Sequence, residues 1–443
     1  MDRMPVALTG QPLPLPLIEG LAPDNGTLRA ADTLAREGRA RASGCLPAGD
    51  DARLLWAAFP EGRRPDALAA ILLPYLHVSC TCGGARFPCR HVLALLLINP
   101  ADATAGAPPW ATARLEAARR ATRPSAAPPD SDARIATAAT GLGELARWLG
   151  DQLDHGLAAL PAAGPRPWHA AADRLADAYA PAAARELRQL AALPGNGADW
   201  PERLLPRLGR LALLADAFGR RDALPPAERA DVLAAAGLPP RPGDDRVVDT
   251  WLALGRRQIV DGGQRRVHTW LRGLASGRWA LLEAYQPLKR LDGLCLPTGG
   301  RLRGELAFAP GAWPLVAQPV DGLRLEPDAP QDGPSGGHDH LGHDIAAAIA
   351  DYAAARAANP WLRLGPMLLR DVFVEPAPSG WRLRDRGGRL LPLPPRYGHG
   401  WALLALAGDH PLTLCGEWDG TTLTPLSVYH NGWRDLSAWK ALP

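Results

Sequence analysis

Residues 77–98 read HVSCTCGGARFPCRHVLALLLI and carry the most informative pattern in the chain. Three cysteines and one histidine in this stretch follow the spacing C-x-C-x6-C-x-H; they are Cys80, Cys82, Cys89 and His91. Thiolate and imidazole are ligands that zinc prefers, and three Cys with one His complete a tetrahedral site. A complete site leaves no position open for water, so the sequence predicts one Zn²⁺ ion with a structural role.

The sequence around these residues explains how the side chains could converge. Residues 76–82 have the character of a short strand, in which Cys80 and Cys82 point to the same side. The two glycines that follow permit a tight turn. Pro88 then suits the start of a helix, which continues through an apolar run and ends before Pro100. A strand, a turn and a helix held by one ion are therefore expected.

The spacing C-x-C-x6-C-x-H followed by an apolar helix resembles the SWIM zinc finger. The likeness to bacterial SWIM-domain proteins of about this length extends along most of the chain. It includes LAPDNGTLRAADTLA at 21–35, RFPCRH at 86–91, and the later stretches DWPERLLPRLGRLALLADAF, DTWLALGRRQ and SGRWALLEAY. The resemblance implies that the chain binds protein or DNA. Bacterial relatives are often encoded beside MoxR-type AAA ATPases and von Willebrand A domain proteins, which implies a protein partner of one of these kinds.

Length and composition set broad limits. A chain of 443 residues can hold about three domains, and its hydrophobic content of 47% is ordinary for a globular protein. Apolar runs are too short for a membrane span, and the N-terminal apolar stretch is too broken by proline for a signal peptide. Clustered cysteines fit zinc in a reducing compartment better than disulfides, so a cytoplasmic location is expected.

The pattern of apolar residues, turns and prolines predicts an α+β fold. We expect a small zinc-pinned N-terminal finger of strand and helix, a central helical bundle, and a β-rich C-terminal region with one helix near 344–358. A Pro/Ala-rich linker should uncouple the finger from the rest. The predicted limits are 1–100 for the finger, 101–131 for the linker, 132–240 for the helical domain and 241–443 for the β-rich domain.

Arginines near the finger allow two interpretations. Arg86 and Arg90 flank the ligands, and further arginines occur in an expected helix over 26–42; these are Arg29, Arg36 and Arg39. They could form an ordinary solvated face or a stripe that contacts phosphates. The net charge is only +3. We therefore expect any nucleic-acid binding to be weak and sensitive to salt.

A second group of ligand-type residues lies in a polar Gly/Pro-rich loop. His338, His340 and His343, with neighbouring aspartates, could form an open metal site, which makes a metal-dependent hydrolase the alternative function. The simpler interpretation is a loop followed by a helix that Asp344 caps. Recognised nucleotide-binding, zinc-protease and serine-nucleophile motifs are absent from the sequence. The leading hypothesis is a non-enzymatic, zinc-dependent interaction protein.

Overall fold

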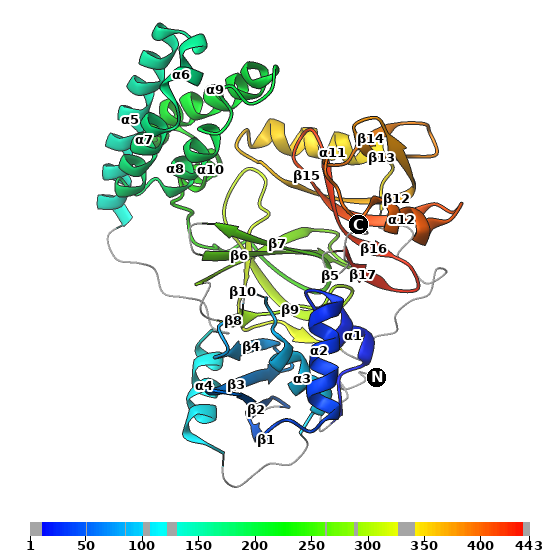
Figure 1. The fold of residues 1–443 in the computed structure, drawn as a ribbon. Coiled ribbons are helices and arrows are strands. Elements are labelled where there is room, and N and C mark those ends of the chain that lie inside the picture. Colours follow the sequence, from blue (N-terminus) through cyan, green and yellow to red (C-terminus); the bar gives the residue numbers. More distant parts are fainter. Residues whose placement is uncertain are drawn as a thin grey trace.

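The computed structural model describes residues 11–49, 51–84, 86–100, 107–121, 131–261, 264–287, 291–326 and 342–436. Three antiparallel sheets and a separate group of helices make up the fold (Figure 1). The predicted α+β class is confirmed, with the finger at the N-terminal end, a helical region from Ser131 to Ala236 and a strand-rich region after it. Within the described residues, no helix has the length and apolar character needed to cross a membrane.

Most α-helices lie in the first part of the chain and around its centre, and two lie among the later strands. They are α1 (Leu15–Leu21), α2 (Asn25–Arg36), α3 (Arg90–Ile98), α4 (Pro109–Ala121), α5 (Ser131–His155), α6 (Leu160–Ala163), α7 (Arg166–Asp177), α8 (Pro181–Leu190), α9 (Trp200–Gly219), α10 (Pro226–Ala236), α11 (Ile345–Ala358) and α12 (Gly400–Ala407). Helix α1 lies in a segment whose prolines suggest an extended chain. The helix forms because Pro14 precedes it and Pro16 falls in its first turn, where no backbone N–H is needed.

The strands form three sheets. The N-terminal sheet has the order β1-β2-β3-β4-β8, the central sheet β10-β9-β5-β6-β7 with β11 beside β9, and the C-terminal sheet β14-β13-β12-β15-β16-β17. Their bounds are β1 (Ala42–Pro47), β2 (Arg53–Glu61), β3 (Arg64–Leu73), β4 (His77–Cys80), β5 (Arg246–Asp261), β6 (Gln264–Gly273), β7 (Trp279–Pro287), β8 (Leu291–Leu294), β9 (Arg301–Phe308), β10 (Ala317–Pro319), β11 (Arg324–Leu325), β12 (Gly365–Ala377), β13 (Gly380–Arg384), β14 (Leu390–Pro392), β15 (Leu412–Trp418), β16 (Leu423–Tyr429) and β17 (Trp433–Asp435).

The finger is not uncoupled from the β-rich part of the chain. Strand β8 pairs with β4, in a register that runs from His77 opposite Leu294 to Cys80 opposite Leu291. One hydrophobic core contains α3, the N-terminal sheet and the inner face of the central sheet, including Trp251 and Phe308. The sequence-based boundaries stay a prediction, but the expectation of an uncoupled finger is wrong. Short-range patterns cannot reveal that β8, which lies far downstream of β4 in the sequence, completes the sheet.

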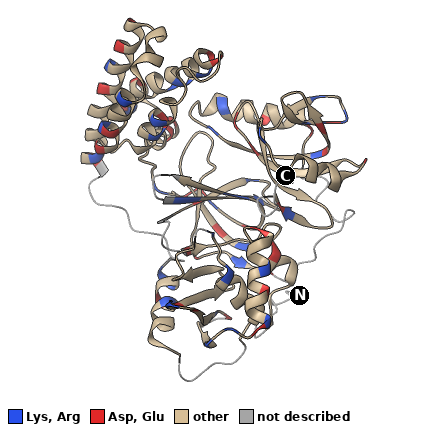
Figure 2. Ribbon diagram, viewed as in Figure 1, with Lys and Arg blue, Asp and Glu red and all other residues tan. Residues whose placement is uncertain are grey.

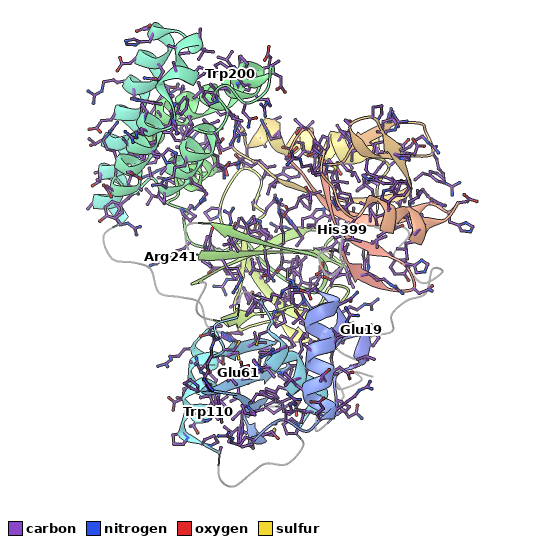
Figure 3. The ribbon with its side chains drawn as sticks, in the orientation of Figure 1. Glu19, Glu61, Trp110, Trp200, Arg241 and His399 are labelled. Atoms are coloured by element: carbon purple, nitrogen blue, oxygen red, sulfur yellow. The ribbon has the colours of Figure 1, made fainter. Side chains whose placement is uncertain are left out.

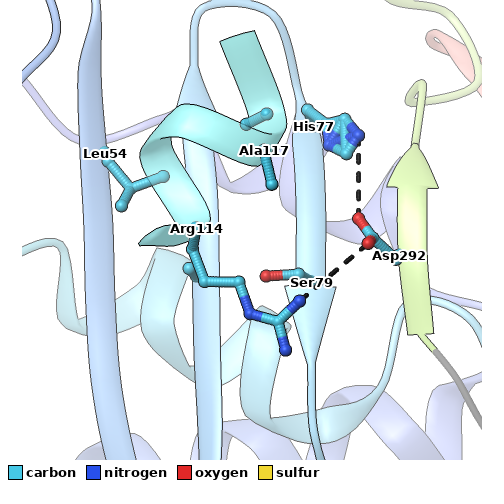
Figure 4. A pocket seen from close by; sticks show the side chains of 8 residues that line it. Leu54, His77, Ser79, Arg114, Ala117 and Asp292 are labelled. Atoms are coloured by element: carbon cyan, nitrogen blue, oxygen red, sulfur yellow. Dashed lines mark ion pairs between the residues drawn. The ribbon is translucent and has the colours of Figure 1, made fainter. Parts of the chain in front are cut away.

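The predicted linker also contributes to the finger. Within 101–131, α4 packs Ala111, Leu115 and Ala118 against the outer face of the N-terminal sheet. At the edge of this sheet, His77 of β4 and Arg114 of α4 both approach Asp292 of β8, at 3.7 and 4.0 Å (Figure 4). Helix α4 therefore helps to hold β8 in place.

A buried arginine joins three distant parts of the chain. Arg256 of β5 donates to the carbonyl oxygen of Leu21 at 3.0 Å and to the Cys295 sulfur at 3.3 Å. Its guanidinium also lies 3.5 Å from the carboxylate of Asp435, and both side chains are almost inaccessible to solvent. Such a charge can be buried only where it is paired and hydrogen-bonded.

The central helices have a core of their own. Residues of α5, α7, α8, α9 and α10 form one hydrophobic cluster that includes Trp168, Leu187 and Phe218. Figure 1 shows these helices standing to one side of the three sheets. This separate core supports the expectation that the helical region can fold without the finger.

In the C-terminal half, the pairs Gly387-Gly388 and Asp419-Gly420 are typical of tight turns and predict two hairpins, and Asp344 is the predicted cap of a helix; the structure agrees with all three. The hairpin β13–β14 turns at Gly387 and Gly388, and β15–β16 turns at Asp419 and Gly420. Helix α11 begins after Asp344, whose side chain accepts a hydrogen bond from the Ala347 N–H at 2.8 Å.

Candidate zinc centre

Strand β4 and helix α3 bring the four predicted ligands to one point. Cys80 is the last residue of β4, and Cys82 follows it in a turn where Gly83 has a φ of 61°. Cys89 is the N-cap of α3, and His91 lies in the first turn. Helix α3 ends where Asn99 takes the left-handed conformation, next to Pro100, as the sequence predicts. The expected strand, turn and helix are confirmed.

The ligand atoms are close enough to share one ion. The three sulfurs and a ring nitrogen of His91 all lie within 4.8 Å of one another. His91 Nδ1 is 3.9 Å from the Cys80 sulfur and 4.0 Å from the Cys89 sulfur. The side chains of Cys80, Cys89 and His91 are buried, whereas Cys82 is half-buried. Across the described ranges, this is the only such group of three or more His, Cys, Asp or Glu side chains.

Three thiols this close together cannot all ionise without a cation. Hydrogen bonds with Cys82 and Cys89 raise the pKa of Cys80, and those with Cys80 and Cys89 lower the pKa of Cys82. A divalent cation removes this conflict because it binds all three sulfurs as thiolates. The donor set and its burial therefore fit zinc, and three Cys with one His fill the coordination sphere.

Glu61 orients the histidine ligand. Its carboxylate at the end of β2 (Figure 3) lies 2.7 Å from His91 Nε2, whereas the other ring nitrogen, Nδ1, is the one near the sulfurs. A carboxylate in this position fixes the tautomer that leaves Nδ1 free to bind metal, and makes that nitrogen a stronger donor. The Phe59 ring, 5.3 Å from the His91 ring, packs beside it. Sequence reasoning missed Glu61 because nothing local links it to a histidine 30 positions later.

Comparison with known protein families agrees with this geometry. Residues 75–99 match the family model of the SWIM zinc finger, and residues 133–236 match that of the SWIM-associated four-helix bundle domain.

The chain carries a SWIM zinc finger and a SWIM-associated four-helix bundle.

The resemblance drawn from the sequence is thus confirmed, and so is one structural zinc ion held by a Cys3His cluster. No curated protein and no solved structure matches the chain.

The central sheet also supports the SWIM finger. Gln258 of β5 donates a hydrogen bond to the carbonyl oxygen of Phe87, in the loop between Cys82 and Cys89. The Phe87 side chain is fully buried in the shared core. The loop between the metal ligands Cys82 and Cys89 is therefore fixed to a strand residue that lies 171 positions downstream.

Most arginines predicted to contact nucleic acid are bound to carboxylates. Arg86 pairs with Asp24, the residue that caps α2, and Arg90 lies 2.7 Å from Glu61. Arg36 pairs with Asp32 at 2.8 Å, and Arg39 pairs with Glu37. Arg29 is exposed. Because α2 ends at Arg36, earlier than the expected helix over 26–42, Arg39 lies beyond it. The five arginines do not form one continuous helical stripe.

Of the second group of histidines, only His343 lies within the described residues. His338 and His340 lie outside the described residues. His343 forms an isolated bridge with Leu369, and its Nε2 is 3.6 Å from the Asp351 carboxylate in an exposed position. Asp344 acts as a helix cap, as the simpler interpretation of this segment requires.

Proposed function

We propose that this chain is a non-enzymatic interaction protein of the cytoplasm, in which a zinc-stabilised finger and the attached bundle present surfaces to a protein partner. The observation that carries the proposal is the closed, buried metal centre. An ion with four protein ligands has no position for a substrate, so its contribution is to hold the fold. The zinc-stabilised finger is then a rigid part of the surface that binds the partner protein.

Charge near the finger favours protein over nucleic acid. A surface that binds nucleic acid needs solvated arginines that are free to pair with phosphate groups. Here Arg36, Arg39, Arg86 and Arg90 already contact carboxylates. We therefore keep the expectation that duplex DNA binds weakly, at micromolar affinity at best and less as salt increases.

The kind of partner follows only from the resemblance to bacterial SWIM-domain proteins. A MoxR-type AAA ATPase or a von Willebrand A domain protein remains the preferred candidate. The test mixes the full zinc-loaded chain with each purified candidate from the source organism and measures complex mass by light scattering after gel filtration. A stable complex with either one supports the proposal, and no complex with either refutes this choice of partner.

DNA binding is measured in parallel by gel shift over a salt series. The wild-type chain is compared with an Arg86→Ala/Arg90→Ala double variant and with an Arg119→Ala/Arg120→Ala control on α4. We expect only weak, salt-sensitive shifts for all three. A nanomolar complex that tolerates salt and disappears only in the Arg86/Arg90 variant would make DNA the partner instead.

Metal analysis separates the proposal from the hydrolase alternative. One zinc per chain fits a structural site alone, whereas a second bound ion would indicate an additional centre such as one at His338, His340 and His343. We expect one zinc ion per chain in the wild type and the same zinc content in a His343→Ala variant.

A further inference from the structure

The helical bundle contacts the C-terminal part of the chain through the carboxylate of Glu186, which two arginines share. Glu186 of α8 accepts a hydrogen bond from Arg207 of α9 at 2.7 Å and another from Arg363, in the link between α11 and β12. Gln189 also accepts from both arginines, at 3.2 Å each. Nearby, Asn359 donates to Asp231 of α10 at 2.9 Å. These bonds hold α11 beside the bundle (Figure 1).

The arginines at this junction outnumber the carboxylates that face them, Glu186 and Glu283. Arg210 lies one turn after Arg207 on α9 and within electrostatic range of Arg356 on α11 and of Arg363. Burial, and then these two arginines, lower the pKa of Arg210, while Glu186 opposes the shift. Besides burial, Arg266 of β6 also lowers the pKa of Arg363, and it lies within electrostatic range of Glu283 as well. Figure 2 shows basic residues on the helices that border the junction.

Helix α9 also exposes an apolar stripe. Leu205 and Leu213 are 46% and 43% exposed, and the residues between them on the same face, Pro206, Gly209 and Ala212, are exposed as well. Positions 205, 209 and 213 are spaced by four, so they form one line along the helix. The opposite face of α9 is already buried in the bundle core through Leu204, Leu208, Leu211 and Leu214. A surface helix normally has polar residues on its outer face.

The stripe and the arginines adjoin one another. Arg210 follows Pro206 by four positions and precedes Leu213 by three, so it borders the stripe. On α11, Ile349 is 38% exposed and lies two turns before Arg356 on the same side of that helix. No acidic residue occurs on α9 between Glu202 and Asp216. The α9–α11 surface, defined by Leu205, Leu213, Arg210, Arg356 and Ile349, is thus apolar with a basic edge.

We propose that the α9–α11 surface binds an amphipathic helix of a partner protein, with its apolar residues on the stripe and its Asp and Glu side chains toward the arginines. This inference rests on the proposed function. Charge complementarity selects the occupant, because Arg pairs strongly with carboxylates. A second copy of the chain fits poorly, because a two-fold interface here would set arginines against arginines. A compact phosphate ligand would use the arginines but leave the leucines unexplained.

The test uses defined helical peptides and fluorescence anisotropy. An 18-residue labelled peptide carries leucine at i, i+3, i+4 and i+7 spacing with glutamate on the flanking positions. A matched peptide has lysine in place of glutamate, and a third has the leucines scrambled. We expect only the first to bind the full chain. Leu213→Ser and Arg210→Glu should each weaken it about tenfold or more.

The matched control is Leu153→Ser on α5, a leucine that is 54% exposed. It should leave peptide binding unchanged, and thermal unfolding should show all variants folded. The inference is overturned if the acidic peptide does not bind or if the lysine peptide binds equally well. It is also overturned if Leu213→Ser leaves binding of the acidic peptide unchanged. Inorganic triphosphate that binds through Arg210 alone would replace it with an anion site.

The light-scattering experiment separates this inference from the proposed function. If the partner complex forms but survives both Leu213→Ser and Arg210→Glu, the α9–α11 surface is refuted and the proposed function stands. If the acidic peptide binds as described while neither candidate protein forms a complex, the choice of partner fails and the surface stands.

Discussion

Loss of the zinc ion should unfold the finger and the central sheet together, while the helical bundle stays folded. The cleanest change is Cys82→Ser, because Cys82 is only half-buried and the substitution removes a ligand with little loss of packing. Without the ion, the four ligands no longer tie the first turn of α3 to the end of β4. Both elements belong to the core that the finger shares with the central sheet.

The expected cost can be estimated from α3. Its Val92, Leu93, Leu95 and Leu96 are almost completely buried in the shared core. Burial of each such side chain contributes about 1.5 to 3 kcal/mol, so undocking α3 would cost about 6 to 12 kcal/mol. A whole domain is typically stable by about 5 to 15 kcal/mol. The remaining sheet therefore should not survive on its own, particularly because β8 would also lose its pairing with β4.

Hydrogen exchange measured by mass spectrometry can locate the loss. In Cys82→Ser, or in wild type treated with a zinc chelator, we expect exchange to rise in residues 77–98 and also in β5, β8 and β9. Exchange in α7–α10 should stay slow, because their core contains no residue of the finger. Cys45→Ser is the matched control, a buried cysteine outside the metal cluster. Protection in β5 and β9 that remains after residues 77–98 open would refute the shared-core argument.

Three further substitutions test other parts of the structure. Glu61→Ala should weaken zinc binding by roughly 10- to 100-fold in a chelator competition, because His91 loses the group that orients it. The control Glu37→Ala should leave zinc affinity unchanged. Equal zinc affinity in Glu61→Ala and wild type would show that the contact does not assist metal binding. Arg256→Met should reduce the free energy of unfolding in urea by about 3 to 5 kcal/mol, because it leaves Asp435 buried without its charge partner, and a loss below about 1 kcal/mol would contradict this. The third concerns His268, which lies between Glu283 at 3.0 Å and Glu417 at 3.7 Å. Burial opposes charge on all three groups, yet the two carboxylates raise the pKa of His268. His268 in turn lowers the pKa of both carboxyls, and Arg257 adds to this effect at Glu417. The contribution of His268 to stability is therefore complete below its ordinary pKa of 6.5 and is lost as the pH rises through its higher pKa in the folded protein. The contribution of the two carboxylates is complete above their ordinary pKa of 4.5 and is lost as the pH falls through their lower pKa values in the folded protein. Stability should fall on both sides of the interval from about 4.5 to 6.5. His268→Gln should flatten the alkaline side while the exposed His410→Gln does not, and an unchanged pH profile in His268→Gln would be inconsistent with this assignment.

Short-range patterns predicted what is built from neighbouring residues. The ligands Cys80, Cys82, Cys89 and His91 fall within 12 positions, so strand alternation and a helix start suffice to bring them together. The same holds for the hairpin turn at Gly387 and for the cap of α11 by Asp344. Alternating and helical spacing likewise located the bundle and the strand-rich half.

Only the tertiary structure decided how these pieces depend on one another. Glu61 reaches His91 from another strand, Gln258 reaches the Phe87 loop from the central sheet, and Arg256 bonds to Leu21 across 235 positions. The arginines at the finger look alike in sequence, and their acidic partners appear only when helices and strands are placed in space. The physical reason is that metal ligation and turns are fixed by local backbone geometry. Burial, charge pairing and sheet completion depend instead on which distant segments share a core.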